Sequence, residues 1–262
     1  MKKNILWVAC ICNIFMHGME KIFPVKEEKK SPMLQHLACI MDGNRRWARD
    51  HKFETFFGHK KGLDAVQHVV DFCLIKQIPY LSLYAFSLEN LEQRSQKEQN
   101  YLFEVLAQEA LQNIDTFKNK NIRIKFIGDS ALFPLSMKSV CEKAEQETES
   151  AKALQVNFLL CYGGRQEIVD ATKRIAIEVA QGTLQPESIT PDLFEKFLWT
   201  SPMPSPDLII RTGGQQRLSN FLLFQCAYSE LYFTDCLWPD ISPVELESAL
   251  TYFDTCRKNF GK

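Results

Sequence analysis

The sequence predicts an α/β protein built on a mostly parallel sheet. Short apolar runs rich in β-branched and aromatic residues alternate with longer segments of helical spacing. The strand-like runs are apolar at nearly every position, which is typical of strands covered on both faces. Apolar residues make up 45% of the 262 residues. One large domain can therefore bury a sizeable core.

Six segments have the composition of strands, and in chain order they are 36–41, 80–86, 122–127, 156–161, 208–210 and 231–233. Segments with helical spacing separate most of them, at 62–76, 95–117, 135–151, 165–181 and 244–259. In the first of these, Leu63, Val66, Val69, Val70 and Cys73 fall on one helix face. Strands that alternate with helices in this way favour parallel pairing.

Charge and cysteine content exclude several classes of function. The formal net charge is −1, so composition predicts neither a nucleic-acid-binding surface nor a polybasic membrane tether. Any anion-binding site must therefore be local. The nine cysteines show no Cys-x-x-Cys spacing, and most lie in apolar runs. We interpret them as small core residues of a protein in the reducing cytoplasm.

The first 33 residues are predicted to be an extension outside the domain that covers 34–262. Two lysines precede an apolar run at 5–15, which resembles a secretory signal but is too short to span a bilayer and lacks a small-x-small cleavage site. The alternatives are a disordered or membrane-touching extension, or a true start at Met16, Met19 or Met33. The charged stretch at 26–32 is interpreted as a linker.

Polar residues follow several of the predicted strands. In parallel sheets, ligands bind beyond the carboxyl ends of the strands. Residues of this kind after the first, second and fifth strands are Asp42, Gly43, Asn44, Arg45, Arg46, Ser87, Glu89, Asn90, Arg94, Arg211, Thr212, Gly213, Gly214, Arg217 and Ser219. The last strand is flanked by Glu230 and Asp240. We expect these groups to converge on one rim of the sheet.

These residue types fit a phosphorylated ligand with a bound cation. Arginine forks form bidentate bonds to phosphate oxygens, and helix starts after Gly43 and near Ser219 would add backbone N–H donors. Carboxylates among arginines oppose anion binding unless a hard cation lies between them. Because Mg²⁺ takes one or two carboxylates plus phosphate oxygens, Asp42 and Glu230 are the predicted metal ligands.

Each motif alone also has a purely structural interpretation. Asp-Gly-Asn is a common turn sequence, and two adjacent arginines are commonly solvated. His59 is equally compatible with a structural place near a helix start, and Trp47 with packing. The pair Gly163-Gly164 is interpreted as a strand-to-helix turn. It is the predicted convergence of several motifs on one rim that favours function.

Several of these motifs carry a family resemblance. From about His36 to Gly261 the chain resembles the cis-prenyltransferases, among them the bacterial undecaprenyl diphosphate synthases. The matching stretches are "MDGNRRWA", "GHKKG", "LYAFSLEN", "GD", "YGGR", "DLIIRTGGQQRLSNFLLFQCAYSELYF" and "WPD". The resemblance implies a six-stranded parallel sheet flanked by helices, an apolar tunnel, a homodimer, Mg²⁺ as cofactor and no nucleic acid.

The resemblance also implies roles for individual residues. Asp42 matches the aspartate that positions Mg²⁺ against the starter diphosphate, and Glu230 matches a second metal residue. Asn90 matches the asparagine assigned to proton removal. Residues matching the substrate sites are Gly43, Asn44, Arg45, Arg46, Trp47, His59, Ser87, Leu88, Glu89, Leu91, Arg94, Arg211, Arg217, Leu218 and Ser219. The implied reaction condenses isopentenyl diphosphate onto farnesyl diphosphate to give undecaprenyl diphosphate, with transient contact at the inner membrane surface during product release.

The chain departs from the family pattern at a few positions. Arg45 stands where many members have Gly, and Thr55 where many have a phosphate-binding arginine, so Arg45 is a candidate replacement. Leu91 replaces a tryptophan, and one extra residue precedes Arg94. Two alternatives remain: a different product length, or a non-catalytic partner subunit. The helical trans-prenyltransferases are disfavoured because the chain has no Asp-Asp pair.

Overall fold

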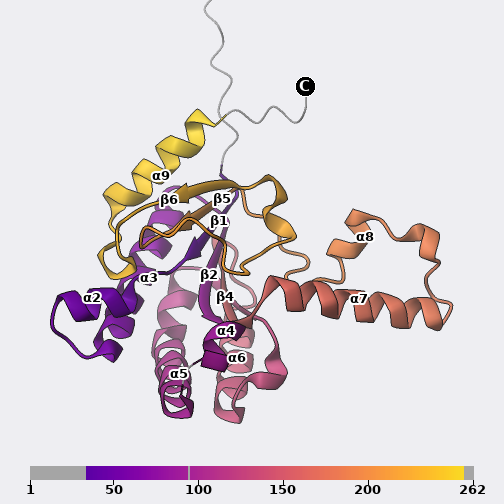
Figure 1. Cartoon of the computed structure of the whole chain (residues 1–262), viewed down its shortest axis with the longest axis horizontal. Coiled ribbons are helices and arrows are strands. Elements are labelled where there is room, and N and C mark those ends of the chain that lie inside the picture. The colour runs from indigo at the N-terminus through magenta and orange to yellow at the C-terminus, as the bar shows by residue number, and fades with distance from the viewer. Residues whose placement is uncertain (1–33, 94, 257–262) are drawn as a thin grey trace, which may run out of the picture. The chain divides into compact units, whose positions relative to one another are not determined.

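The computed structural model describes residues 34–93 and 95–256, so the predictions made for residues 1–33 lie outside the described part. Six strands form one sheet in the order β3-β4-β2-β1-β5-β6, and every neighbouring pair is parallel. Their bounds are β1 His36–Ile40, β2 Tyr80–Ser87, β3 Ile122–Ile127, β4 Leu154–Tyr162, β5 Leu208–Arg211 and β6 Glu230–Phe233. The predicted parallel α/β fold is confirmed (Figure 1).

The described helices follow the five predicted segments, with three short helices in addition. Their bounds are α2 Asn44–Asp50, α3 Thr55–Ile75, α4 Leu88–Gln93, α5 Gln96–Asn119, α6 Leu135–Glu147, α7 Gly164–Ala180, α8 Pro191–Glu195 and α9 Pro243–Thr255. Helix α3 begins seven residues before the predicted start at residue 62. The sequence pattern does not mark this first part, because its apolar side chains are exposed rather than buried. Helix α4 buries no residue, so no periodic apolar signal marks it.

Alternate residues of β1 divide between two packed layers. Leu37 and Cys39 belong to the core formed with α3, α9 and the end of α5, whereas Ala38 and Ile40 pack on the opposite face against Phe221 and its neighbours. A third cluster joins α5 and α6 to β2 and β4. All five strand residues of β1 are buried. Both faces of the central strands are therefore covered, as the continuous apolar runs predict.

Helices α2 and α3 approach each other through two glycines. A Cβ on Gly58 would lie 2.0 Å from the backbone oxygen of Asn44, and one on Gly62 would lie 2.3 Å from the Asn44 side-chain oxygen. Both glycines lie on α3, four residues apart, and therefore on the same helix face. The indole of Trp238 donates a hydrogen bond to the Gly62 carbonyl at 2.8 Å. The close approach of the two glycines to Asn44 fixes the position of α2, which begins two residues after Asp42.

No helix within residues 34–93 and 95–256 is both long enough and apolar enough to span a bilayer.

Gly58→Ala should destabilise the protein. Alanine favours a helix by up to about 1 kcal/mol over glycine, but forcing a methyl group into the Asn44 backbone costs roughly 1 to 3 kcal/mol. The clash should dominate, because the contacted atom belongs to the backbone and cannot rotate away. We expect a net loss of about 1 to 2 kcal/mol in the free energy of unfolding, measured by urea denaturation. Lys60→Ala, at an exposed position of the same helix, is the control; equal stability of the two variants would contradict this packing.

Candidate active site

A cavity of about 870 Å³ opens at the carboxyl edge of the sheet. Its wall is built from the residues that follow β1 and β2, the start of α7 and the segment after β5. Twelve predicted site residues lie on this wall: Asp42, Gly43, Asn44, Arg45, Arg46, His59, Ser87, Glu89, Asn90, Arg211, Arg217 and Ser219. The predicted convergence on one rim is confirmed for these residues.

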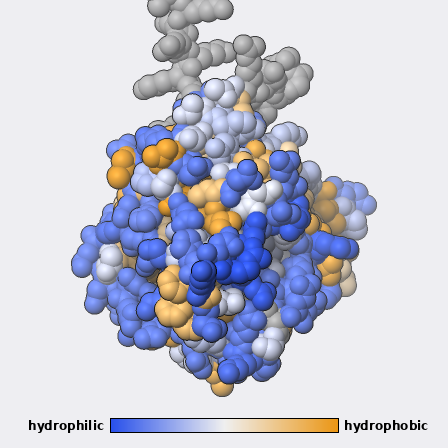
Figure 2. All heavy atoms as spheres, turned by 60° about the vertical axis from the view of Figure 1, so that its left-hand side comes forward, coloured by the Kyte–Doolittle hydropathy of each residue, from blue (hydrophilic) through white to orange (hydrophobic). Residues whose placement is uncertain are grey.

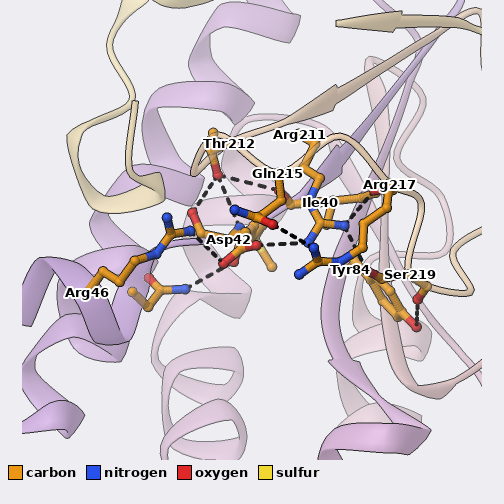
Figure 3. Close-up of polar contacts among 11 residues, drawn as sticks. Ile40, Asp42, Arg46, Tyr84, Arg211, Thr212, Gln215, Arg217 and Ser219 are labelled. Atoms are coloured by element: carbon orange, nitrogen blue, oxygen red, sulfur yellow. Dashed lines mark hydrogen bonds and ion pairs between the residues drawn. The ribbon is translucent and has the colours of Figure 1, made fainter. Parts of the chain in front are cut away.

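Asp42 lies between two guanidinium groups at the centre of this wall (Figure 3). Its Oδ1 accepts a hydrogen bond from Arg46 Nη2 at 3.1 Å, and its Oδ2 accepts one from Arg211 Nη2 at 2.8 Å. Thr212 fixes the backbone, since its hydroxyl donates to the Asp42 carbonyl at 2.7 Å. The Asp42 side chain remains 30% exposed. The carboxylate is thus held firmly while part of it faces the cavity.

Strand register brings Asp42 and Arg211 together. Ile40 of β1 lies opposite Arg211 of β5 in the parallel ladder, so the residue two places beyond Ile40 emerges beside the arginine. The Arg211 side chain is only 4% exposed. Its other terminal nitrogen donates to the Ser219 hydroxyl at 2.8 Å and to the Arg217 carbonyl. These bonds offset the cost of burying a guanidinium and tie the 217–219 segment to the rim.

The cavity wall is positively charged although the whole chain is nearly neutral. Five arginines line it, against two carboxylates, those of Asp42 and Glu89. The five arginines are Arg45, Arg46, Arg165, Arg211 and Arg217. Guanidinium forks bind phosphate oxygens with charge-assisted bonds. The cavity is therefore suited to a ligand carrying several negative charges, as the sequence predicts.

Gly43 shapes the turn between β1 and α2. Its φ of 116° lies in the left-handed region that side chains disfavour, and a Cβ there would meet the backbone of Leu237 at 3.0 Å. The following residue, Asn44, donates from its side chain to the Met41 carbonyl at 3.2 Å. The turn directs Arg46 back over Gly213, whose missing side chain leaves room for the guanidinium.

Two expectations about the rim are wrong within this chain. Glu230 is the first residue of β6 and lies opposite Leu208, the first residue of β5. It therefore lies at the amino edge of the sheet, three residues and about 10 Å of strand before the rim, and cannot share a metal with Asp42 of the same chain. No helix starts near Ser219 either: Ser219 and Asn220 form a left-handed turn, with φ of 51° and 64°.

The described cavity lining does not include four of the other predicted residues, Trp47, Leu88, Leu91 and Leu218. Trp47 is buried, stacks on His51 with ring centroids 4.2 Å apart, and donates to Asp240 at 2.7 Å. Leu88 and Leu91 of α4 pack on the third cluster, and Leu218 packs beside Phe221. Arg94 lies outside the described residues. Direct contacts of these residues with substrate remain predictions.

The wall also contains polar residues that were not predicted from the sequence, among them Gln93, Arg165 and Asn220. Arg165 at the start of α7 lines the cavity, and its backbone N–H donates to Asn220 Oδ1 at 2.8 Å. The Asn220 amide nitrogen in turn donates to Glu89 at 2.7 Å and to Gln166 at 3.0 Å. Asn220 thus joins the first turn of α4 to the start of α7. The stretches "YGGR" and "RLSN" contain Arg165 and Asn220, but only Gly163 and Gly164 of the first and Arg217, Leu218 and Ser219 of the second were interpreted.

Tyr84 of β2 forms the apolar side of the site. Burial raises the pKa of its hydroxyl, which therefore remains protonated and donates to the carbonyls of Tyr162 at 3.2 Å and Ser219 at 3.3 Å. The ring stacks on Phe221 with centroids 4.7 Å apart. The stacked rings of Tyr84 and Phe221 therefore support the left-handed turn at Ser219.

A second cavity, of about 270 Å³, lies between α3, α5 and the sheet. Most of its lining is apolar, including Leu106, Phe117, Phe126 and Phe158. Polar side chains such as Glu109 are a minority of the wall. The apolar tunnel that the resemblance implies stays a prediction, and this cavity is a candidate for part of it.

Comparisons with known proteins identify the family. The family model for putative undecaprenyl diphosphate synthase matches residues 40–261. A farnesyl-diphosphate-specific ditrans,polycis-undecaprenyl-diphosphate synthase of Legionella pneumophila is 42% identical over 87% of this chain and 95% of its own. A geranylgeranyl-diphosphate-specific tritrans,polycis-undecaprenyl-diphosphate synthase of Picrophilus torridus is 37% identical over 91% and 94%.

A solved structure agrees with these relatives. Lavandulyl diphosphate synthase from Lavandula x intermedia, in complex with dimethylallyl diphosphate, superposes with a TM-score of 0.85 at 32% identity, covering 88% of this chain and 99% of its own. Both the sequence relatives and this structure span nearly the whole described domain. The chain therefore belongs to the cis-prenyltransferase (undecaprenyl diphosphate synthase) family and is a prenyltransferase of the kind that elongates prenyl chains in the cis configuration.

Proposed function

We propose that this enzyme condenses isopentenyl diphosphate repeatedly onto farnesyl diphosphate to give undecaprenyl diphosphate. The main supporting observation is the Arg46–Asp42–Arg211 arrangement on the wall of a positively charged cavity. The choice of farnesyl diphosphate rests on the bacterial relatives, at 40 to 42% identity, against 37% for the geranylgeranyl-specific archaeal ones. Because that margin is narrow, geranylgeranyl diphosphate is the second candidate starter.

The arginines are proposed to stabilise the leaving group. When the allylic C1–O bond breaks, its electron pair moves onto the diphosphate, and preplaced guanidiniums stabilise the added charge without reorganising. Asp42 keeps Arg46 and Arg211 in place for this step. The isopentenyl double bond then forms the new bond to allylic C1, and a proton leaves its C2. Arg217 and Ser219, which lie next to Arg211, are proposed to bind the isopentenyl diphosphate.

Asp42 also fits a Mg²⁺ site that the substrate completes. It is partly exposed, and Mg²⁺ commonly takes one protein carboxylate with phosphate oxygens and water. Among the described residues, no three His, Cys, Asp or Glu side chains cluster as an all-protein metal site. Bound there, Mg²⁺ would stabilise the negative charge of the departing diphosphate as a Lewis acid.

Asn90 is proposed to orient the departing proton rather than to hold it. Asn90 lines the cavity, and its backbone N–H donates a hydrogen bond to Ser87 Oγ at 3.1 Å. A neutral amide is too weak a base to retain a proton. We therefore propose that the proton passes to a phosphate oxygen or to water, with Asn90 holding the geometry. The hydrogen bond that Asn220 donates to Glu89, the residue before Asn90, positions helix α4.

The growing chain is proposed to enter the apolar cavity between α3 and α5. Burying one CH₂ group gains about 0.8 kcal/mol, so each isoprene unit gains roughly 3 to 4 kcal/mol. Release of a long product is then slow, and a lipid surface accelerates it. We further propose a homodimer at the cytoplasmic face of the membrane, supported by exposed Val169 and Ile177 on α7, a helix that projects from the sheet (Figure 1).

Purified chain should incorporate labelled isopentenyl diphosphate without any partner subunit. We expect activity with Mg²⁺ and none after chelation, greater activity with farnesyl than with geranylgeranyl diphosphate, and a C55 product on chromatography after dephosphorylation. Addition of detergent should raise the turnover rate. Well-folded protein that incorporates no label would contradict catalysis and favour a partner-subunit role, whereas shorter or longer products would correct only the chain length.

Asn220→Gly should lower kcat about tenfold with little change in melting temperature, which corresponds to about 1.4 kcal/mol in the barrier. Glycine accepts the left-handed backbone of this position, so the change removes only the side-chain bonds to Glu89, Gln166 and the Arg165 N–H. Gln166→Ala removes one of these bonds and is the matched control. Steady-state kinetics with both substrates saturating measures the effect; wild-type kcat in Asn220→Gly would rule out this positioning role.

A further inference from the structure

Three phenylalanines are exposed around the turn between α2 and α3. The exposed fractions of Phe53, Phe56 and Phe57 are 51%, 39% and 45%. Phenylalanine is usually buried, so three exposed rings in five residues need an explanation. The rings contact one another, with centroid distances of 5.5 Å for Phe53–Phe57 and 4.4 Å for Phe56–Phe57. They form one apolar patch rather than three separate side chains.

Positive charge surrounds this patch. Arg49 and Lys52 line, with Phe53 and Phe57, a surface hollow of about 470 Å³. The segment from Arg49 to Lys61 carries four Lys or Arg against two Asp or Glu, in a chain whose net charge is −1. Arg49 pairs with the neighbouring Asp50 at 3.2 Å, an exposed contact that is easily exchanged. We call Arg49, Lys52, Phe53, Phe56, Phe57 and Lys60 the aromatic-basic surface.

The aromatic-basic surface adjoins the helices that line the apolar cavity. Phe56 contacts Tyr101 of α5 edge to face at 5.9 Å. Helices α3 and α5 contribute Leu63, Val66 and Leu106 to the 270 Å³ cavity. The patch therefore lies over the first turns of the same two helices whose later turns enclose an apolar space. Figure 2 shows the side of the molecule to which α2 and α3 belong, where small apolar patches lie among strongly hydrophilic residues.

We propose that the aromatic-basic surface docks on an anionic lipid bilayer. Exposed aromatic rings ringed by Lys and Arg are the composition of segments that lie in the membrane interface, where rings enter the headgroup region and cations meet anionic lipids. Docking here brings the first turns of α3 and α5 to the lipid. A prenyl chain held between these helices can then leave without crossing water. This purpose rests on the proposed function, whereas the docking itself does not.

Vesicle cosedimentation of the full chain without substrates tests the docking. The probes are vesicles of phosphatidylcholine alone and of phosphatidylcholine mixed with phosphatidylglycerol. We expect binding to the mixed vesicles that weakens with added salt, and little binding to phosphatidylcholine alone. Arg49→Glu with Lys52→Glu should lower affinity for the mixed vesicles at least tenfold. Phe53→Ser with Phe57→Ser should lower it similarly.

Matched controls lie on other surfaces. Leu132→Ser removes an apolar side chain that is 41% exposed, close to the exposure of Phe57, and Lys143→Glu with Lys152→Glu reverses two charges at exposed positions. Both controls should bind vesicles as the wild type does. Equal binding by all variants, or equal binding to both kinds of vesicle, would overturn the proposal. So would a change of oligomeric state in the phenylalanine variant, which would assign the patch to a second copy of this chain.

A kinetic measurement separates this proposal from the proposed function. The surface variants should retain the wild-type rate for a single condensation in detergent-free solution, because none of their residues lines the catalytic cavity. In multiple turnover, mixed vesicles should accelerate the wild type and not the variants. Vesicle binding with no condensation activity would refute the proposed function alone. Condensation activity with no vesicle binding would refute the docking surface alone.

Discussion

Arg211 donates to Asp42 from a position that is only 4% exposed, and this contact joins the ends of β1 and β5. A guanidinium buried without a partner costs several kcal/mol. Because Arg211 is desolvated, loss of its bond to Asp42 would strongly destabilise the fold. The same guanidinium bonds Ser219 and the Arg217 carbonyl. One buried cation therefore fixes two strand ends and a loop, and the remaining arginines of the cavity are arranged around it.

The fold supplies the second constraint through small residues. Gly58 and Gly62 let α2 approach α3, and Gly213 leaves room for the Arg46 guanidinium. Arg46 then meets the other oxygen of Asp42. The two arginines thus reach the carboxylate from different elements, one from a helix and one from a strand. A carboxylate held from two sides has little freedom to rotate, and its exposed face remains directed at the cavity.

Much of the fold and part of the site could be predicted from sequence, for physical reasons. Continuous apolar runs identify buried parallel strands, and parallel pairing brings carboxyl ends to one edge, which is why Asp42 and Arg211 were expected together. Glu230 fails by the same rule, since it precedes its strand. Asn220 was missed because its role depends on a left-handed turn and on partners at the starts of two helices, α4 and α7, that are distant in sequence. Neither leaves a periodic signal.

Asp42 is expected to have two opposed effects on an anion in the cavity. Its charge repels a phosphate directly, yet it is proposed to attract one through Mg²⁺. Calorimetric titration with inorganic diphosphate, with and without Mg²⁺, separates these effects in the wild type and in Asp42→Asn. We predict that the variant binds metal-free diphosphate at least as tightly as the wild type but loses the gain from Mg²⁺. A variant that retains the full Mg²⁺ gain would contradict the account and leave Asp42 as a clamp for arginines alone.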